Sequence, residues 1–526
     1  MIVHKIKAEQ KSGDLKKEDQ LAYKLAELAF RAKDIPLDPE AIEMAKCRVI
    51  DNAAISIGAI NQHAVCVARD KAMSSEGTGR ASIYGMPSDR TFDPSRAAFA
   101  NAVAVRFLDQ DDTYLAAEYS HPDDNISPIL AVAQQLSMSG KDMLRGIIVA
   151  YEIHVALVGT GNDTGICLHK HKVDHMTHIA AASAAGIASM LSLSLDQTYH
   201  AINFAVHNAI SSRQSRKGDI GSQKEFVPGF SAQISIDAVD SAMRDLKGPN
   251  PVYEGVDSII RRFLDGRDDL GAEYKVELAE PGVDALKNIL ITYPKEHAFE
   301  YQGQAIIDAT LDLLGEMGDN SLSSIKSITL QTSHHTHHVI GTDANDPQKI
   351  DPDAPRGTLD HSIMFAIART LQIGEWHHER TYDISSEDKD KLRDLMHKVV
   401  TEYDQKWEDA YHSQDPKVQA FGGKLIIELD NGEIFEKEKA RANAHCYGDT
   451  PWGREEYIQK YRSLCDDKVS KAETDKFLNA VDQMEVLLTE GLCDLTPCVD
   501  LITLKMLEPG GIFNIGTALS ADSVAA

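Results

Sequence analysis

The sequence predicts a mainly α protein in which a large helical domain, built from both ends of the chain, encloses a smaller α/β domain. Three observations carry this prediction. Helical patterns with capped starts fill the first half of the chain, a strand and a hairpin appear after residue 282, and helical patterns return after residue 442. The 526 residues also exceed the ~250–300 at which one core stops growing, so at least two cores are expected.

The first part of the helical domain is expected over residues 20–282. The sequence Asp38-Pro39-Glu40 supplies an N-cap, a proline at the first helical position and an acid in the first turn. The segments Ser139–Asp142 and Ser194–Gln197 have the spacing of capping boxes. Small residues, as in Ala180–Ala188, allow helices to approach closely. We therefore expect a closely packed multi-helix core.

Residues 283–442 are expected to form the smaller α/β domain. Ile325–Thr332 alternates apolar and polar residues like a half-buried strand. Lys424–Glu436 alternates on both sides of Asn431-Gly432, a pair that favours a two-residue hairpin turn. Helical patterns cover three further segments, which are Gln302–Met317, Asp360–Leu371 and Glu387–Val400.

The end of the chain is helical again. Arg454–Tyr461 and Lys471–Leu488 carry helical patterns, and we expect residues 443–505 to rejoin the helical domain. The last segment, residues 506–526, is rich in Gly, Ser and Ala and is expected to be a loose tail.

Composition narrows the classes of function. The net charge of −27 argues against nonspecific binding to nucleic acid and against binding to an anionic membrane surface. The sequence contains no run that is long and apolar enough for a transmembrane helix, and its first 20 residues lack the apolar core of a secretory signal. A cytoplasmic protein is therefore expected.

The cysteines exclude two kinds of chemistry. Seven cysteines are scattered along the chain and no CxxC motif occurs. This pattern supplies neither a disulfide framework nor the thiolate set that would hold an iron–sulfur cluster. An iron–sulfur hydro-lyase is thus excluded.

An acidic segment at residues 108–125 is the most informative part of the sequence. It places six acids around His121, in one break between Ala-rich helices: Asp109, Asp111, Asp112, Glu118, Asp123 and Asp124. So many carboxylates near one histidine favour a site that handles protons or charge. The alternative is a charged loop with a cap after His121-Pro122.

A basic segment, Ser212–Lys224, has the opposite character. Its cations are Arg213, Arg216, Lys217 and Lys224, with one acid among them. In a chain of net charge −27, such a local reversal is what the binding of a polycarboxylate or phosphate requires. A solvated basic loop is the alternative.

Histidines form two runs, one with His169, His171, His175 and His178, the other with His334, His335, His337 and His338. Spacings of three and four residues could place two imidazoles on one helix face for zinc, but no HExxH motif occurs. Asp174-His175 is better interpreted as the start of a helix with its imidazole toward a cavity. The second run is interpreted as the rim of a substrate site, and no metal site is predicted.

Six segments, in order, closely resemble the MmgE/PrpD family, also called the 2-methylcitrate dehydratase family. They are residues 108–125, Asp174-His175, Ser212–Lys224, Tyr293–His297, Leu359–Met364 and Asp430–Gly432. The resemblance implies a large all-helical domain from N- and C-terminal parts, with a smaller α/β lid inserted between them. It also implies a homodimer without metal or organic cofactor. The activities it implies are dehydration of 2-methylcitrate, decarboxylation of cis-aconitate and epimerisation of an iminodicarboxylate.

The resemblance assigns catalytic roles to three residues: Asp109, His121 and His175. In each of the implied reactions a carbanion or enolate-like charge develops beside a carboxylate of a small polyanion. We expect His121 and His175 to share proton transfer, in a division that the sequence leaves open, and Asp109 to orient or tune a histidine. A buried structural acid paired with Arg106 is the alternative for Asp109.

Four further residues are assigned to substrate binding: Thr113, Arg213, Lys224 and His297. Lys224, helped by Arg213, is expected to neutralise a substrate carboxylate. Thr113 is expected to donate a hydrogen bond to the substrate, and His297 to reach the site from the lid on closure. Solvated loop positions are the alternative for all but Lys224.

The segment Ala116–Asn125 resembles the dehydratase branch more than the decarboxylase branch. The expected activity is therefore cofactor-independent dehydration of 2-methylcitrate, or of a close tricarboxylate, in the methylcitrate cycle of propionate catabolism. Another family reaction is the alternative among enzymes, and a catalytically silent homologue that binds a ligand or a metal is the alternative from another class. Because His334–His338 and Asp343–Arg356 depart from the family pattern, the sequence leaves the exact substrate open.

Overall fold

The computed structural model describes residues 1–507 and 511–513, apart from residues 12, 14, 162, 217–219, 270, 281 and 319–321. Lys217 of the basic segment and most of the predicted tail 506–526 therefore lie outside the described residues. The mainly α fold class is confirmed. None of the helices in the described ranges is long and apolar enough to cross a membrane.

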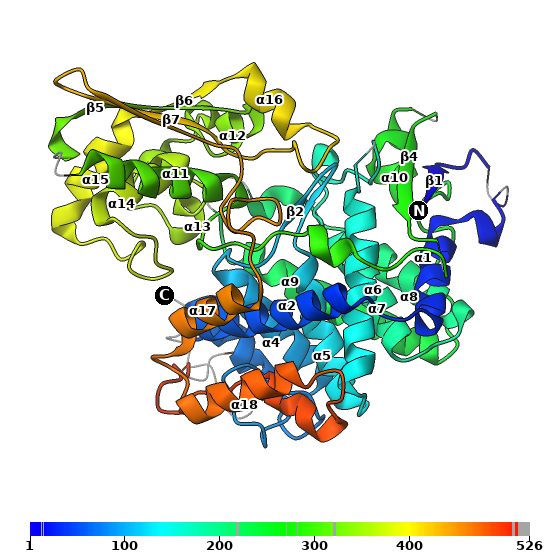
Figure 1. Cartoon of the computed structure of the whole chain (residues 1–526). Helices are drawn as coiled ribbons and strands as arrows, with labels where there is room; N and C mark the ends of the chain where they lie inside the picture. The colour runs from blue at the N-terminus through cyan, green and yellow to red at the C-terminus, as the bar shows by residue number, and fades with distance from the viewer. Residues whose placement is uncertain are drawn as a thin grey trace.

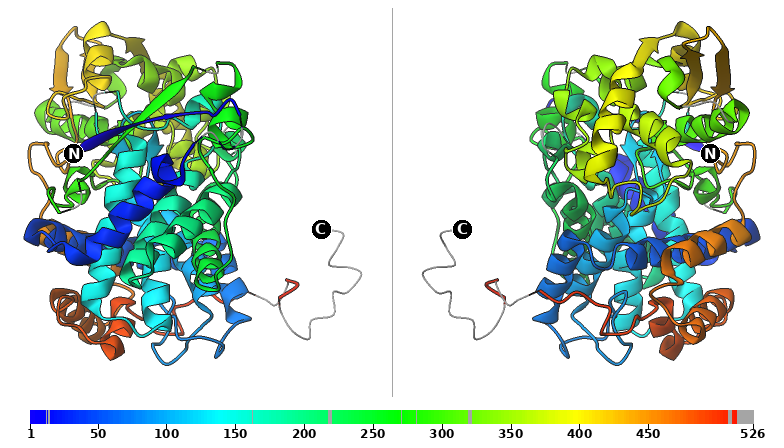
Figure 2. Two further views of the ribbon diagram at one scale, coloured as in Figure 1. Left: turned by 90° about the vertical axis from the view of Figure 1, so that its right-hand side faces the viewer. Right: turned by 90° about the vertical axis from the view of Figure 1, so that its left-hand side faces the viewer.

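The larger part of the protein is a bundle of helices (Figure 1). Its helices from the first half of the chain are α1 (Leu21–Arg31), α2 (Pro39–Gly58), α3 (His63–Met73), α4 (Pro94–Phe107), α5 (Ile126–Gln135), α6 (Gly140–Val158), α7 (Met176–Met190), α8 (Leu195–Asn208), α9 (Gln223–Met243) and α10 (Ile259–Phe263). From the C-terminal side come α17 (Arg454–Cys465) and α18 (Lys471–Asp482), and α17 packs along α2 (Figure 2). Segments from both ends of the chain thus share one hydrophobic core.

Small residues set the spacing inside this bundle, as the sequence indicates. Gly146 on α6 faces Gly186 on α7, where an added Cβ would come within 2.6 Å of the Gly146 carbonyl oxygen. Glycine is required at this crossing because the two backbones meet there without side chains between them. The helix α8 begins at a complete capping box formed by Ser194 and Gln197, also as predicted.

A second, smaller core lies around a four-stranded sheet in the order β6–β5–β7–β8. Its strands are β5 (Ile325–Thr332), β6 (Val399–Tyr403), β7 (Gly423–Leu429) and β8 (Ile434–Lys439), and its helices are α11 (Tyr301–Met317), α12 (His334–Val339), α13 (Arg356–Leu359), α14 (Ile363–Ile373), α15 (Ser386–Lys398) and α16 (Gln405–Tyr411). Strands β5 and β6 run parallel, and the other pairs run antiparallel. The apolar residues of β5 and β7 face α11, α14 and α15, which cover one side of the sheet.

Local signals predicted β5 and the β7–β8 hairpin, which turns at Asn431-Gly432 with Gly432 at φ 86°. Other predicted bounds were wrong. The helix expected over Glu387–Val400 ends at Lys398 because Val399 pairs with β5 as the start of β6. The helix expected from Asp360 begins at Ile363, since the Ser362 hydroxyl caps it by accepting a hydrogen bond from the Phe365 amide.

Short strands elsewhere were not predicted. Strand β1 (Ile2–Lys7) pairs antiparallel with β4 (Glu273–Leu278). Within the acidic segment, β2 (Tyr114–Leu115) pairs with β3 (Tyr119–Ser120). A third cluster of buried aromatic and apolar side chains, including Tyr114, Tyr293, Tyr301 and Phe421, joins this hairpin to the sheet-bearing part.

Candidate active site

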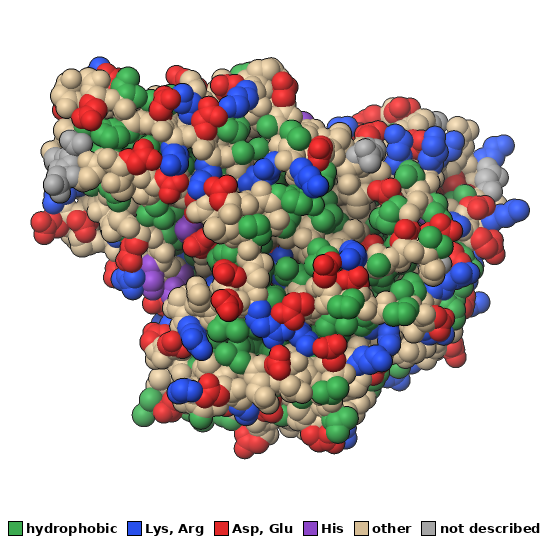
Figure 3. Space-filling view, in the orientation of Figure 1, with side chains coloured by type: hydrophobic (Ala, Val, Ile, Leu, Met, Phe, Trp, Pro, Cys, Tyr) green, Lys and Arg blue, Asp and Glu red, His purple; other side chains and the backbone are tan. Residues whose placement is uncertain are grey.

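A cavity of about 430 Å³ lies between the helical bundle and the sheet-bearing part. In the space-filling view, histidine side chains appear in the hollow between the two parts (Figure 3). Six chain segments contribute to the cavity wall, and the residues that carry ionisable or hydroxyl groups there include Arg106, Asp109, Thr113, Tyr119, His121, His169, Lys172, His175, Arg213, Arg216, Lys295, Glu300, His335 and His361. Five of the seven predicted site residues are among them.

The acidic segment is held together by its own buried carboxyl groups. The side chain of Asp123 accepts a hydrogen bond from the Asp112 amide, and the side chain of Asp112 accepts one from the Asp123 amide. Asp112 also contacts Arg48 and accepts a hydrogen bond from the Tyr151 hydroxyl. Burial and the neighbouring acids raise the pKa of Asp123 well above its usual value. These acids therefore act as the scaffold of the loop.

Asp109 is the electrostatic centre of the cavity floor. It lies 3.0 Å from Arg106 and 2.7 Å from Lys224, and it also forms an ion pair with Lys295. Its backbone has φ 51°, a left-handed conformation that Asp tolerates and that these contacts hold in place. Burial favours the neutral acid, but the three cations outweigh it and keep the pKa of Asp109 well below its usual range. Asp109 is therefore an anion that organises buried cations.

His121 presents one free imidazole nitrogen to the cavity. Its Nδ1 lies 2.7 Å from the backbone oxygen of Asp112, which can only accept, so Nδ1 carries the proton. The lone pair then belongs to Nε2, for which the described residues offer no hydrogen-bond partner. Burial, followed by the charges of Arg106 and Lys295, holds the pKa of His121 well below its usual value. His121 is thus a neutral imidazole arranged to accept a proton at Nε2.

His175 faces His121, with ring centroids 5.6 Å apart, but its nitrogens are engaged differently. The Arg216 guanidinium lies 3.3 Å from His175 Nε2 and can only donate, so Nε2 is the acceptor. Asp174 forms an ion pair with Arg216 at 2.8 Å. Burial outweighs the effect of Asp174 and lowers the pKa of His175 well below its usual value. His175 therefore helps to position the Arg216 guanidinium at the cavity wall.

Arg213, in the basic segment, has an unused donor that is buried. Its Nη1 is buried without a hydrogen-bond partner among the described residues, and its nearest acid, Glu118, lies 3.7 Å away. A buried guanidinium nitrogen without a partner favours binding of a carboxylate from the cavity. Arg216 and Lys172 add positive charge to the same wall.

Thr113 lies on the cavity wall, with its hydroxyl oxygen 3.2 Å from His121 Nδ1. The expected position of Lys224 needs correction. Its Nζ is buried between Asp109 and Asp360, at 2.7 and 3.5 Å, and does not belong to the cavity wall. Its charge is therefore already neutralised by two carboxylates.

The expected position of His297 also needs correction. Its Nε2 lies 2.8 Å from Asp308 on α11, and its side chain does not belong to the cavity wall. Burial lowers the pKa of His297, but the hydrogen bond to Asp308 and the negative charge of Asp308 and Glu296 together outweigh it, so the pKa is raised. Glu300 and Gln302, at the start of α11, lie on the cavity wall instead.

Sequence reasoning missed three groups in the cavity, which are Lys295, Glu300 and His361, whereas His335 belongs to the histidine run that was expected at the rim of a substrate site. Glu300 has the clearest chemical signature, because burial raises the pKa of this carboxyl to about 7. His361 lies 2.5 Å from Asp360 and 3.7 Å from Asp109. A signal was available for Lys295 and His361, since both lie inside segments that carry the family resemblance.

The fold and the cavity together define a mainly α protein with a cation-lined site that holds two neutral imidazoles and a carboxyl group of raised pKa. Two family models match the chain, the MmgE/PrpD N-terminal domain over residues 20–270 and the MmgE/PrpD C-terminal domain over residues 297–485. The chain belongs to the MmgE/PrpD family, and the resemblance noted from its motifs is confirmed.

Curated relatives agree with this membership. The chain is 28% identical to a 2-methylcitrate dehydratase of Salmonella typhi, over 65% of this chain and 69% of the relative. It is 29% identical to a mitochondrial 2-methylcitrate dehydratase of Yarrowia lipolytica, over 66% of each chain. It is 24% identical to the 2-methylcitrate dehydratase-like protein oryR of Aspergillus oryzae, over 77% of this chain and 82% of the relative. The expectation of an enzyme that resembles these dehydratases is confirmed.

Proposed function

We propose that this protein eliminates water from 2-methylcitrate, or from a close tricarboxylate, to give 2-methyl-cis-aconitate. The observation that carries the proposal is the Nε2 of neutral His121, which has no hydrogen-bond partner among the described residues and faces a cavity lined by Arg213 and Arg216. The curated relatives named 2-methylcitrate dehydratase support the choice of substrate. Propionate catabolism through the methylcitrate cycle is the setting that this activity implies.

The elimination follows from the groups on the cavity wall. Arg213 and Arg216 bind substrate carboxylates and stabilise the charge that develops beside them. His121 Nε2 removes the proton from C2, which is α to a carboxylate, and the C2–H electron pair forms the double bond to C3. The hydroxyl on C3 leaves with a proton from an acid, so the products are the unsaturated acid and water.

Glu300 is our choice for that acid. Its carboxyl group lies on the same cavity wall as His121, and its pKa of about 7 keeps a large fraction protonated at neutral pH. His175, whose Nε2 accepts from Arg216, positions that cation. This division refines the sequence-based expectation that His121 and His175 share proton transfer.

The domain arrangement belongs to the same proposal. We infer that residues 20–282 and 443–505 form the helical domain and that residues 283–442 form a lid. His335 on α12 and Tyr119 on β3 support this view, because their side chains meet at 3.3 Å across the cavity. Closure of the lid would exclude water from the elimination. A cytoplasmic homodimer is part of the proposal.

A substrate panel tests the proposed activity. Purified protein is incubated with 2-methylcitrate, citrate or cis-aconitate, while absorbance of the unsaturated acid and release of carbon dioxide are followed. We expect the unsaturated product from 2-methylcitrate and no carbon dioxide from cis-aconitate. Release of carbon dioxide would assign the decarboxylation of the family instead, and no turnover of any acid would contradict the proposed activity.

A Glu300→Gln variant is expected to lose roughly 10²-fold in kcat, the lower end of what one positioned acid contributes. Glu300 works in its protonated form, so wild-type kcat/KM should fall as pH rises through about 7, the pKa of this group. The variant has no such proton to lose, so this alkaline decrease should disappear. An exposed neighbour, Glu296, provides the matched control Glu296→Gln. An unchanged pH profile in Glu300→Gln would remove Glu300 from the mechanism.

A further inference from the structure

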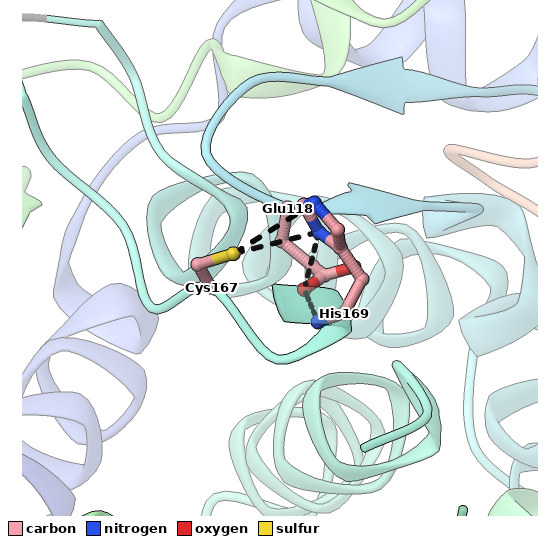
Figure 4. Close-up of side chains that lie close together, drawn as sticks. All are labelled: Glu118, Cys167 and His169. Carbon is pink, nitrogen blue, oxygen red and sulfur yellow. Dashed lines mark hydrogen bonds and ion pairs between the residues drawn. The ribbon is translucent and has the colours of Figure 1, made fainter. Parts of the chain in front are cut away.

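Three side chains outside the His121 and His175 pair converge beside the cavity: Glu118, Cys167 and His169 (Figure 4). His169 Nδ1 lies 3.5 Å from Cys167 Sγ and 3.2 Å from Glu118 Oε2. The sulfur, nitrogen and oxygen atoms all lie within 4.8 Å of one another. The proposed elimination uses none of these three side chains.

Hydrogen bonds link these three side chains. Both the sulfur and the carboxylate oxygen approach the same imidazole nitrogen, and one N–H proton cannot serve both fully. Oε2 of Glu118 also accepts hydrogen bonds from the amides of Leu168 and His169, at 2.5 and 2.6 Å. These bonds fix the Glu118 carboxylate beside His169.

The set of donors matches one class of ion. Thiolate, imidazole and carboxylate together suit zinc, with metal–ligand lengths of ~2.3 Å to sulfur and ~2.0–2.2 Å to nitrogen and oxygen. Tetrahedral angles then separate nitrogen from sulfur by ~3.6 Å and nitrogen from oxygen by ~3.4 Å. The observed separations of 3.5 and 3.2 Å agree with both values.

The cluster borders a second cavity. Cys167 and His169 line this cavity, of about 550 Å³, and His169 and Tyr119 line both cavities. The Glu118 side chain is fully buried, and that of His169 is 26% exposed. Three protein ligands with an accessible fourth position is an arrangement that binds zinc together with a water molecule.

We propose that Glu118 Oε2, Cys167 Sγ and His169 Nδ1 form a binding site for a divalent zinc-like metal ion in the wall between the two cavities. Binding releases the thiol proton of Cys167 to solvent, because the thiolate is the ligand. Arg213 contacts the other oxygen of Glu118, on the cavity side. The metal therefore adds positive charge next to the cation that faces the substrate cavity.

Cobalt binding tests this site without any activity measurement. Chelator-treated, desalted full-length protein is titrated with Co²⁺, and the near-ultraviolet thiolate-to-cobalt charge-transfer absorption is followed. We expect this band to saturate at one cobalt per chain and to disappear when Zn²⁺ is added. Cobalt that binds only to the His334–His338 run gives no such band, because imidazole is its only ligand there.

Two variants and one control show whether the absorption band arises from cobalt bound at this site. Cys167→Ser should abolish it, and His169→Gln should weaken cobalt binding at least about tenfold, since even loss of a supporting group costs that much. Cys493→Ser, at a partly exposed thiol outside both cavities, should leave the band unchanged. Circular dichroism establishes whether each variant is folded. If the Cys167→Ser variant does not fold, the cobalt affinity of the His169→Gln variant decides whether the site exists. The proposal is overturned if wild-type protein gives no band or if a folded Cys167→Ser variant keeps it.

Discussion

Replacement of His121 by asparagine is expected to lower kcat for dehydration by about 10²–10⁴-fold, the contribution of one positioned base. The asparagine amide can still donate to the Asp112 carbonyl, as Nδ1 of His121 does at 2.7 Å. The variant therefore retains the local structure and loses only the lone pair of Nε2. Steady-state kinetics with 2-methylcitrate measure the effect, and KM should change little because Arg213 and Arg216 remain.

The pH dependence adds a second measurement on the same residue. A base works in its neutral form, and the pKa of His121 is held well below its usual value of about 6.5. Wild-type kcat/KM should therefore not fall as the pH is lowered through 6.5. Its decrease on the acid side should begin only at a lower pH. A matched control is His207→Asn, at an exposed position on α8, which should behave as wild type. A His121→Asn variant with normal kcat would exclude His121 as the base.

Asp109→Asn is expected to cost about 3–5 kcal/mol in the free energy of unfolding at pH 7, which is the usual result of removing one partner from a buried ion pair. The substitution leaves Arg106, Lys224 and Lys295 without their shared carboxylate, and Asp109 is only 2% exposed. Urea unfolding followed by circular dichroism measures the change. An exposed acid, Asp89, supplies the control Asp89→Asn, for which the free energy of unfolding should be unchanged.

The stability of the protein in acid should also depend on the ionised Asp109 carboxylate. The folded-state pKa of Asp109 is lowered, so its contribution to stability is fully present above the unfolded value of about 3.9 and is lost as pH falls through the folded value. Below that lower value wild type and Asp109→Asn should converge in stability. Equal stability of the two proteins at pH 7 would contradict the role of Asp109 as the centre of the buried cations.

The sequence predicted those elements whose signals are local. The Ser194 capping box, strand β5 and the turn at Asn431-Gly432 each depend on residues within a few positions of one another. The pairing of β1 with β4 depends on segments about half the chain apart, and the end of α15 depends on a partner strand. Such long-range pairing overrides local propensity and leaves little trace in the sequence.

The sequence indicated the part of the candidate site that lies on one segment, but not the contacts made by distant residues. The density of acids indicated the segment at residues 108–125, and the family resemblance singled out Asp109, Thr113 and His121 within it, all three of which lie on the cavity wall. Lys295 contacts Asp109 from 186 residues away, and its place could not be inferred from spacing. Lys224 could be identified as a cation near the site, but the sequence could not show that Asp109 and Asp360 neutralise it. The raised pKa of Glu300 arises from burial, which no local pattern indicates.

A crystal structure of the His121→Asn variant with 2-methylcitrate tests most directly the claim that His121 removes the C2 proton in the cation-lined cavity. We expect the tricarboxylate in the 430 Å³ cavity, with carboxylates bound by Arg213 and Arg216 and the C2 hydrogen directed at the side chain of residue 121. A ligand bound in the 550 Å³ cavity beside Cys167, or bound with its C2 hydrogen directed away from residue 121, would contradict this account.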